Sequence, residues 1–124
     1  MADINWDQFT ERCRQEANKV GQELKEIDML IQQTSSEVNR FMQTNSRAVA
    51  RVRQIETSFD TVPREDIRTA YNRLIENQQR LFTMRGQLEK LQSDQKNLAQ
   101  MADLYQTILN LTEPATPRLA LEQS

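Results

Sequence analysis

The side chains that most often perform catalysis are absent from this sequence or stand without partners. The 124-residue chain has no histidine, the commonest general base and metal ligand. Its one cysteine, Cys13, falls on an apolar stripe, where a small buried side chain is expected rather than a nucleophile. Gly21 and Gly86 stand alone, so no phosphate-binding glycine loop is present, and the carboxylates are scattered. We therefore predict no catalytic site, no metal site and no cofactor.

Composition and charge favour long solvated helices. The chain has only two glycines and three prolines, with 37% apolar residues and a net charge of −2. We expect neither nucleic acid nor a membrane as a partner, because the charge is small and no apolar run approaches the roughly 20 residues of a membrane span. With one cysteine and no signal peptide pattern, the chain is predicted to be cytoplasmic.

Arginine is concentrated in the middle of the chain. From Arg40 to Arg80 there are eight arginines against five acidic residues. We interpret this excess as solvated helix faces, with a docking patch as the alternative.

A heptad pattern organises the first half of the sequence into one helix, about residues 5–60. Apolar residues recur every seven positions in two interleaved series, as in a coiled-coil seam. One series is Ala17, Leu24, Ile31, Val38, Asn45, Val52 and Phe59, and the other is Trp6, Cys13, Val20, Ile27, Thr34, Phe41, Ala48 and Ile55.

The second half repeats the pattern over about residues 63–112. One series is Ile67, Leu74, Leu81, Leu88, Gln95, Ala102 and Leu109, and the other is Ala70, Asn77, Met84, Leu91, Leu98 and Tyr105. Pro114 and Pro117 should stop this helix near Thr112. Residues 1–112 are thus expected to form one helical domain, followed by a proline-containing tether over 113–124.

A turn is predicted between the two helices, at Asp60, Thr61, Val62 and Pro63. Proline restricts the preceding residue to extended backbone, so Val62 should interrupt the first helix. Pro63 suits the first position of the second helix, and Glu65 and Asp66 favour its N-terminal turn.

The nearly equal helices favour an all-α fold, an antiparallel coiled-coil hairpin. If the chain folds back about Thr61, the two series face each other, and Asn45 faces Asn77 as a polar pair that sets the register. The alternative is a proline-kinked rod that dimerises in parallel, in which each asparagine meets its own copy.

More apolar residues are present than one seam needs. The segment from Met101 to Leu111 is apolar around most of its circumference, so more than one side should be covered. We expect a four-helix homodimer, with Met101, Leu104, Ile108 and Leu111 at the contact between protomers. The alternative is a partner helix from another protein.

Three stretches resemble the sensor region of DegS-type two-component histidine kinases. They are residues 52–60 (VRQIETSFD), 65–71 (EDIRTAY) and 80–98 (RLFTMRGQLEKLQSDQKNL). The resemblance implies a non-catalytic, cytoplasmic signal-input and dimerisation module that passes a signal to a downstream kinase core. The alternative is a stand-alone coiled-coil adaptor or structural assembly protein.

Overall fold

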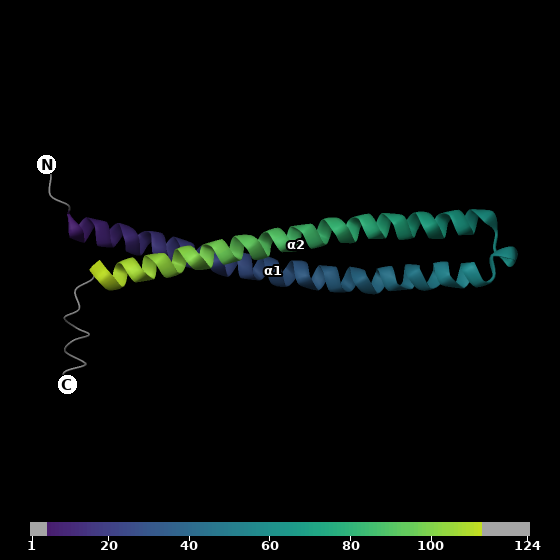
Figure 1. Cartoon of the computed structure of the whole chain (residues 1–124), viewed down its shortest axis with the longest axis horizontal. Helices are drawn as coiled ribbons and strands as arrows, with labels where there is room; N and C mark the ends of the chain where they lie inside the picture. Colours follow the sequence, from purple (N-terminus) through teal and green to yellow (C-terminus); the bar gives the residue numbers. More distant parts are fainter. Residues whose placement is uncertain (1–4, 113–124) are drawn as a thin grey trace, which may run out of the picture. The chain divides into compact units, whose positions relative to one another are not determined.

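The computed structural model describes residues 5–112, which form two long α-helices and no strand. α1 (Trp6–Thr57) and α2 (Arg64–Thr112) are joined through a short 3-10 helix, η1 (Phe59–Thr61). The helices run antiparallel and pack against each other, which confirms the predicted hairpin over the kinked rod (Figure 1). The predicted tether lies outside the described residues.

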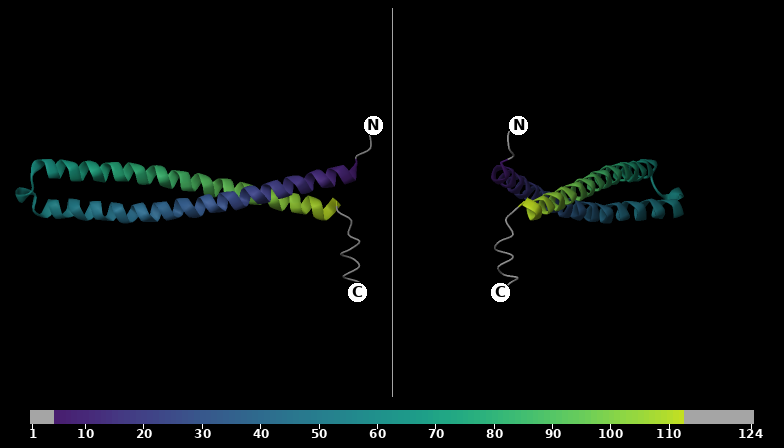
Figure 2. Two further views of the ribbon diagram at one scale, coloured as in Figure 1. Left: turned by 180° about the vertical axis from the view of Figure 1, so that it is seen from behind. Right: turned by 60° about the vertical axis from the view of Figure 1, so that its left-hand side comes forward.

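The chain divides into two compact units, each containing part of both helices. The turn unit is Met29–Ser93, and the terminal unit is described over residues 5–28 and 94–112. Within the turn unit, the views of Figure 2 agree that α1 and α2 lie side by side up to their connection. Both units bury a narrow apolar seam, so each is a two-helix coiled coil.

Side-chain bonds to the backbone end α1 at the turn. The hydroxyls of Thr57 and Ser58 both donate to the carbonyl of Gln54, at 2.8 and 3.0 Å. These bonds satisfy a carbonyl of the last helical turn, whose intrahelical partners are missing. The helix ends at Thr57, three residues before the predicted end at 60.

Pro63 marks the start of α2, as the sequence indicated. Val62 is extended, with φ −101° and ψ 133°, which confirms the restriction that Pro63 places on it. The carbonyl of Pro63 accepts from the amides of Asp66 and Ile67, at 3.0 and 3.2 Å, and the first helical residue is Arg64. Asp60, Thr61, Val62 and Pro63 therefore all lie in the connection between the helices.

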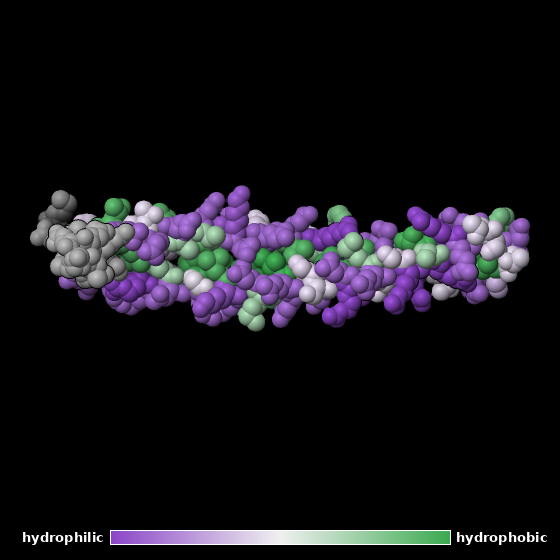
Figure 3. Space-filling model, turned by 90° about the horizontal axis from the view of Figure 1, so that it is seen from below, coloured by the Kyte–Doolittle hydropathy of each residue, from purple (hydrophilic) through white to green (hydrophobic). Residues whose placement is uncertain are grey.

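The buried residues all belong to the predicted heptad series or continue it by one heptad. They are Val38, Ala48, Val52, Ile55 and Leu81 in the turn unit, and Thr10, Cys13, Val20, Ile27 and Leu109 in the terminal unit. Ile55 is the most enclosed, with 1% of its surface exposed. In the face drawn in Figure 3, apolar side chains lie between rows of hydrophilic ones.

Two members of the series are exposed, whereas the others are buried or partly buried. Phe59 is 61% exposed because it belongs to η1, beyond the end of α1. Trp6 is 58% exposed and is the first residue of α1. On α1, the buried seam is therefore shorter at both ends than the heptad series, which runs from Trp6 to Phe59.

Contacts across the seam agree with the predicted register. In the turn unit, the guanidinium carbon of Arg80 lies 4.9 Å from the ring centre of Phe41, whose predicted facing residue is the neighbouring Leu81. In the terminal unit, the side-chain amide of Gln95 donates to the carboxylate of Asp28. The predicted register places Asp94, the neighbour of Gln95, opposite Asp28.

Candidate functional site

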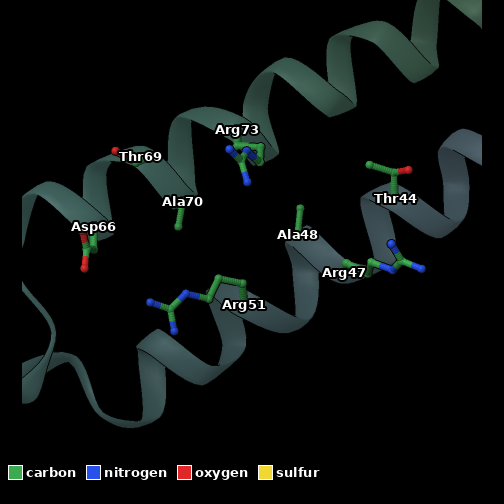
Figure 4. A pocket seen from close by; sticks show the side chains of 8 residues that line it. All are labelled: Thr44, Arg47, Ala48, Arg51, Asp66, Thr69, Ala70 and Arg73. Carbon is green, nitrogen blue, oxygen red and sulfur yellow. The ribbon is translucent and has the colours of Figure 1, made fainter.

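A groove lies between α1 and α2 in the turn unit, with a volume of about 370 Å³. We call it the arginine groove, because three of its eight lining residues are arginines (Figure 4). The lining residues are Thr44, Arg47, Ala48 and Arg51 from α1, and Asp66, Thr69, Ala70 and Arg73 from α2.

Two alanines on the seam explain why space remains between the helices. Ala48 on α1 and Ala70 on α2 belong to neighbouring layers of the seam in the predicted register. Both residues line the groove. A methyl side chain fills far less of the inter-helix space than the valine, leucine or isoleucine of other layers. The groove is therefore a consequence of the seam sequence, and Figure 4 shows both methyl groups between the two ribbons.

The polar residues of the groove share one flank of the coiled coil. Thr44 and Arg51 on α1, and Asp66 and Arg73 on α2, each directly precede a residue of the seam. In an antiparallel pair, such positions of the two helices lie on the same side. The sequence thus brings side chains from both helices to one surface.

The groove carries more positive than negative charge. It has three guanidinium groups, from Arg47, Arg51 and Arg73, against the single carboxylate of Asp66. Arg51 donates to the side-chain oxygen of Gln54 at 3.2 Å. Within residues 5–112, the one ion pair recorded is between Arg14 and Glu11, in the terminal unit. The guanidinium groups of the groove therefore keep most of their donors available.

A second, smaller depression of about 200 Å³ adjoins the arginine groove. Thr44 lines both, and Arg40 and Arg80 add two further cations to the same flank, against Glu37. Arg80 lies over the ring of Phe41, which orients its guanidinium group by a cation–π contact. The positive charge of this flank therefore extends beyond the groove.

The opposite flank of the turn unit carries a tyrosine bonded across the helices. The hydroxyl of Tyr71 donates to Oε1 of Glu56 at 3.0 Å. This hydrogen bond holds the pKa of the Tyr71 phenol above its ordinary value of 10.0, with desolvation and the charge of Glu56 acting in the same direction. Tyr71 therefore stays protonated at neutral pH and ties α2 to α1.

The predicted register pair lies in the seam of the turn unit. Oδ1 of Asn45 and Nδ2 of Asn77 are both buried, and neither has a hydrogen-bond partner among the described residues. One atom is an acceptor and the other a donor. Direct pairing of the two amides remains a prediction.

Three of the four residues predicted at a dimer contact are exposed in the terminal unit. Met101 is 44% exposed, Leu104 57% and Leu111 81%, whereas Ile108 is partly buried. They recur on one side of α2. The contact they would form remains a prediction, because a single chain is described.

Sequence reasoning missed the arginine groove. The excess of arginine between Arg40 and Arg80 is a signal, but the sequence favours solvated helix faces, with a docking patch only as the alternative. The signal that could have located the groove is an alanine in neighbouring layers of both helices, with arginines beside it. For metals, residues 5–112 contain no group of three or more Cys, Asp or Glu side chains arranged to hold an ion.

These features define the class of the protein, an antiparallel coiled-coil hairpin. A comparison with models of protein families matches residues 7–113 to the family described as sensor protein DegS. The match covers most of the chain, so the chain belongs to the DegS sensor family, as the sequence resemblance indicated. At a coarse level it is a sensor-kinase signalling module.

Two other findings accompany this assignment. Searches of curated proteins and of solved structures found no match to the chain. Neither described helix contains a stretch long and apolar enough to cross a lipid bilayer.

Proposed function

We propose that this chain is the non-catalytic, cytoplasmic input and dimerisation module of a DegS-type two-component sensor histidine kinase. The observation that carries the proposal is the family match over residues 7–113, which includes nearly all of both helices. The module would pass its signal to a downstream kinase core through the C-terminal end of α2. A coiled-coil seam has discrete alternative arrangements, so a shift of one helix against the other would give the module two states.

The exposed apolar surface of the terminal unit supports dimerisation. Leu111, which is 81% exposed, would contribute about 1.5–3 kcal/mol if a second chain covered it fully, and Leu104, which is already partly covered, would contribute less. On α1, the rings of Trp6 and Phe9 are also exposed and meet edge to face, with centroids 5.8 Å apart. Apolar residues from both helices thus remain uncovered in this unit, which a four-helix dimer would bury.

Sedimentation equilibrium tests the dimer. The unmodified chain should sediment at about twice its mass of 14.6 kDa. Leu104→Asp combined with Ile108→Asp should give the monomer, because each carboxylate would be desolvated in the contact. Arg64→Asp combined with Arg68→Asp, near the turn, should leave the dimer intact.

A second control separates the terminal unit from the turn unit. Ile75 and Phe82 are also apolar and exposed, but they lie in the turn unit. Ile75→Asp combined with Phe82→Asp should leave the dimer intact. A dimer that dissociates with this pair and survives Leu104→Asp with Ile108→Asp would place the contact at the wrong unit, and an unmodified chain at 14.6 kDa would remove the dimer altogether.

A further inference from the structure

We propose that the arginine groove binds a phosphorylated small molecule, held between α1 and α2. Its volume of about 370 Å³ lies within the range of small-molecule sites. Three arginines line it, Arg47 and Arg51 from α1 and Arg73 from α2, and none of them makes an ion pair with another described residue. Guanidinium groups match the oxygens of carboxylates and phosphates with paired, parallel hydrogen bonds. A phosphate carries more charge and a third oxygen, so it can engage more than one of these arginines at once.

The arginines are placed so that one ligand can contact both helices. Arg47 and Arg51 are four residues apart on α1, so they lie on the same face of that helix. In Figure 4, Arg73 lies on α2 with its guanidinium group on the side that faces α1. With no ligand, these like charges repel across the groove, and a phosphate group between them would replace repulsion with attraction.

The uncharged lining fits the same ligand. Among the described residues, the Thr69 hydroxyl has no hydrogen-bond partner, and the Thr44 hydroxyl makes only a long bond, 3.5 Å to the carbonyl of Arg40. Both hydroxyls can therefore turn toward a phosphate oxygen. The methyl groups of Ala48 and Ala70 form an apolar floor against which a carbon skeleton can lie.

Asp66 gives the ligand a direction. Its carboxylate accepts hydrogen bonds and repels phosphate, so a ligand should place a hydroxyl or amino group beside it. Figure 4 shows Asp66 and Arg51 at one end of the groove. Thr44 is two helical turns before Arg51 on α1, and Arg73 is two helical turns after Asp66 on α2, so both lie toward the other end. We therefore assign the phosphate group to the Arg47–Arg73 end and a hydrogen-bond donor to the Asp66 end.

Binding at this position would act on the hairpin itself. A ligand that contacts Arg47 and Arg73 at once ties α1 to α2, and it stabilises the arrangement of the seam in which both can reach it. That the ligand is the input of the module rests on the proposed function. The binding itself does not, because it can be measured on the hairpin alone.

Isothermal titration calorimetry at low ionic strength tests the site with two probes, inorganic pyrophosphate and ribose 5-phosphate. Both should show saturable binding, at concentrations below about 1 mM. Arg73→Gln and Arg47→Gln should each weaken both probes about tenfold or more, as expected for a lost charge-assisted hydrogen bond. Glutamine keeps the helix propensity of arginine, so these exposed positions should remain folded.

Matched controls separate a built site from general positive charge. Arg53 and Arg68 are exposed arginines of the turn unit that do not line the groove. Arg53→Gln and Arg68→Gln remove the same charge and should change either affinity less than about twofold. Asp66→Asn should strengthen pyrophosphate binding by removing repulsion, and should weaken ribose 5-phosphate binding by replacing a charged acceptor oxygen with an NH2 donor.

Three results would overturn the proposal. They are no saturable binding of either probe, equal losses in the control and groove variants, or a shift by Asp66→Asn in the same direction for both probes. A chain that binds both probes as predicted but sediments as a monomer would refute the proposed dimer and leave the groove assignment standing. A chain that sediments as a dimer but binds neither probe would refute the groove assignment and leave the proposed dimer standing.

Discussion

Replacing Asn45 and Asn77 with leucine tests how the two helices are held in register. Oδ1 of Asn45 and Nδ2 of Asn77 are buried in the turn unit without partners among the described residues. Because one is an acceptor and the other a donor, amides that face each other satisfy both through one hydrogen bond or one bridging water. Neither asparagine alone has that option opposite an apolar side chain.

The size of the effect follows from the cost of a buried polar group. Asn45→Leu leaves the amide of Asn77 against a leucine, which should lower the free energy of unfolding by about 1–3 kcal/mol. Asn77→Leu should do the same for Asn45. The double variant buries no amide, so it should be at least as stable as the unmodified chain. The coupling between the two sites should therefore reach about 1–3 kcal/mol.

Urea unfolding of the four chains, followed by circular dichroism, measures this cycle. Both single variants should unfold at lower urea than the unmodified chain, and the double variant at equal or higher urea. The double variant should also hold its register less tightly, because only apolar contacts then oppose a shift by one heptad. Additive effects of the two replacements, within about 0.5 kcal/mol, would mean that the amides do not meet.

Three further perturbations follow from the hairpin. Tyr71→Phe removes the hydrogen bond to Glu56; because the pKa of Tyr71 is raised in the folded chain, its contribution is complete below the ordinary value of 10.0 and is lost as pH rises through the folded pKa. The difference in Tm between the unmodified chain and this variant should thus be constant from neutral pH to about pH 10 and should vanish as the pH rises further. A difference that stays constant in strong alkali would contradict the hydrogen bond between Tyr71 and Glu56. Gly21→Ala and Gly86→Ala should each raise stability by about 0.5–1 kcal/mol, since an added Cβ meets nothing within 4 Å at either position, and a lower Tm would show a missed contact. Ile55→Ala should lower stability by about 2–5 kcal/mol in urea unfolding, because that side chain is 1% exposed, and a loss below 1 kcal/mol would argue against this seam.

Much of the fold could be predicted because local rules and the heptad pattern agree. Pro63 forces Val62 out of the helical region whatever the tertiary context, so the turn could be placed from the sequence. The seam could be placed because every buried residue occupies a heptad position. The exposed position of Phe59 could not be predicted from the heptad pattern. Hydrogen bonds of the Thr57 and Ser58 hydroxyls end α1 before the pattern stops.

The arginine groove was harder to predict, since it depends on how layers of the two helices fall together. The register that pairs Asn45 with Asn77 places Ala48 opposite Leu74 and Ala70 opposite Val52, so each small residue has a large partner. In the structure Ala48 and Ala70 line one groove, so the two small residues leave a shared space at the surface. Arginine counts alone could not distinguish this from solvated helix faces, because the distinction needs the side on which each guanidinium group lies.

Autophosphorylation of a histidine-kinase core joined after Ser124 tests most directly that the chain is a signal-input and dimerisation module. The rate should differ about fivefold or more between the unmodified hairpin and Leu104→Asp with Ile108→Asp, the low end of typical allosteric coupling. Asn97→Asp with Gln100→Asp adds the same charge at exposed positions of the terminal unit and should leave the rate unchanged. Equal rates in all three fusions would contradict the account.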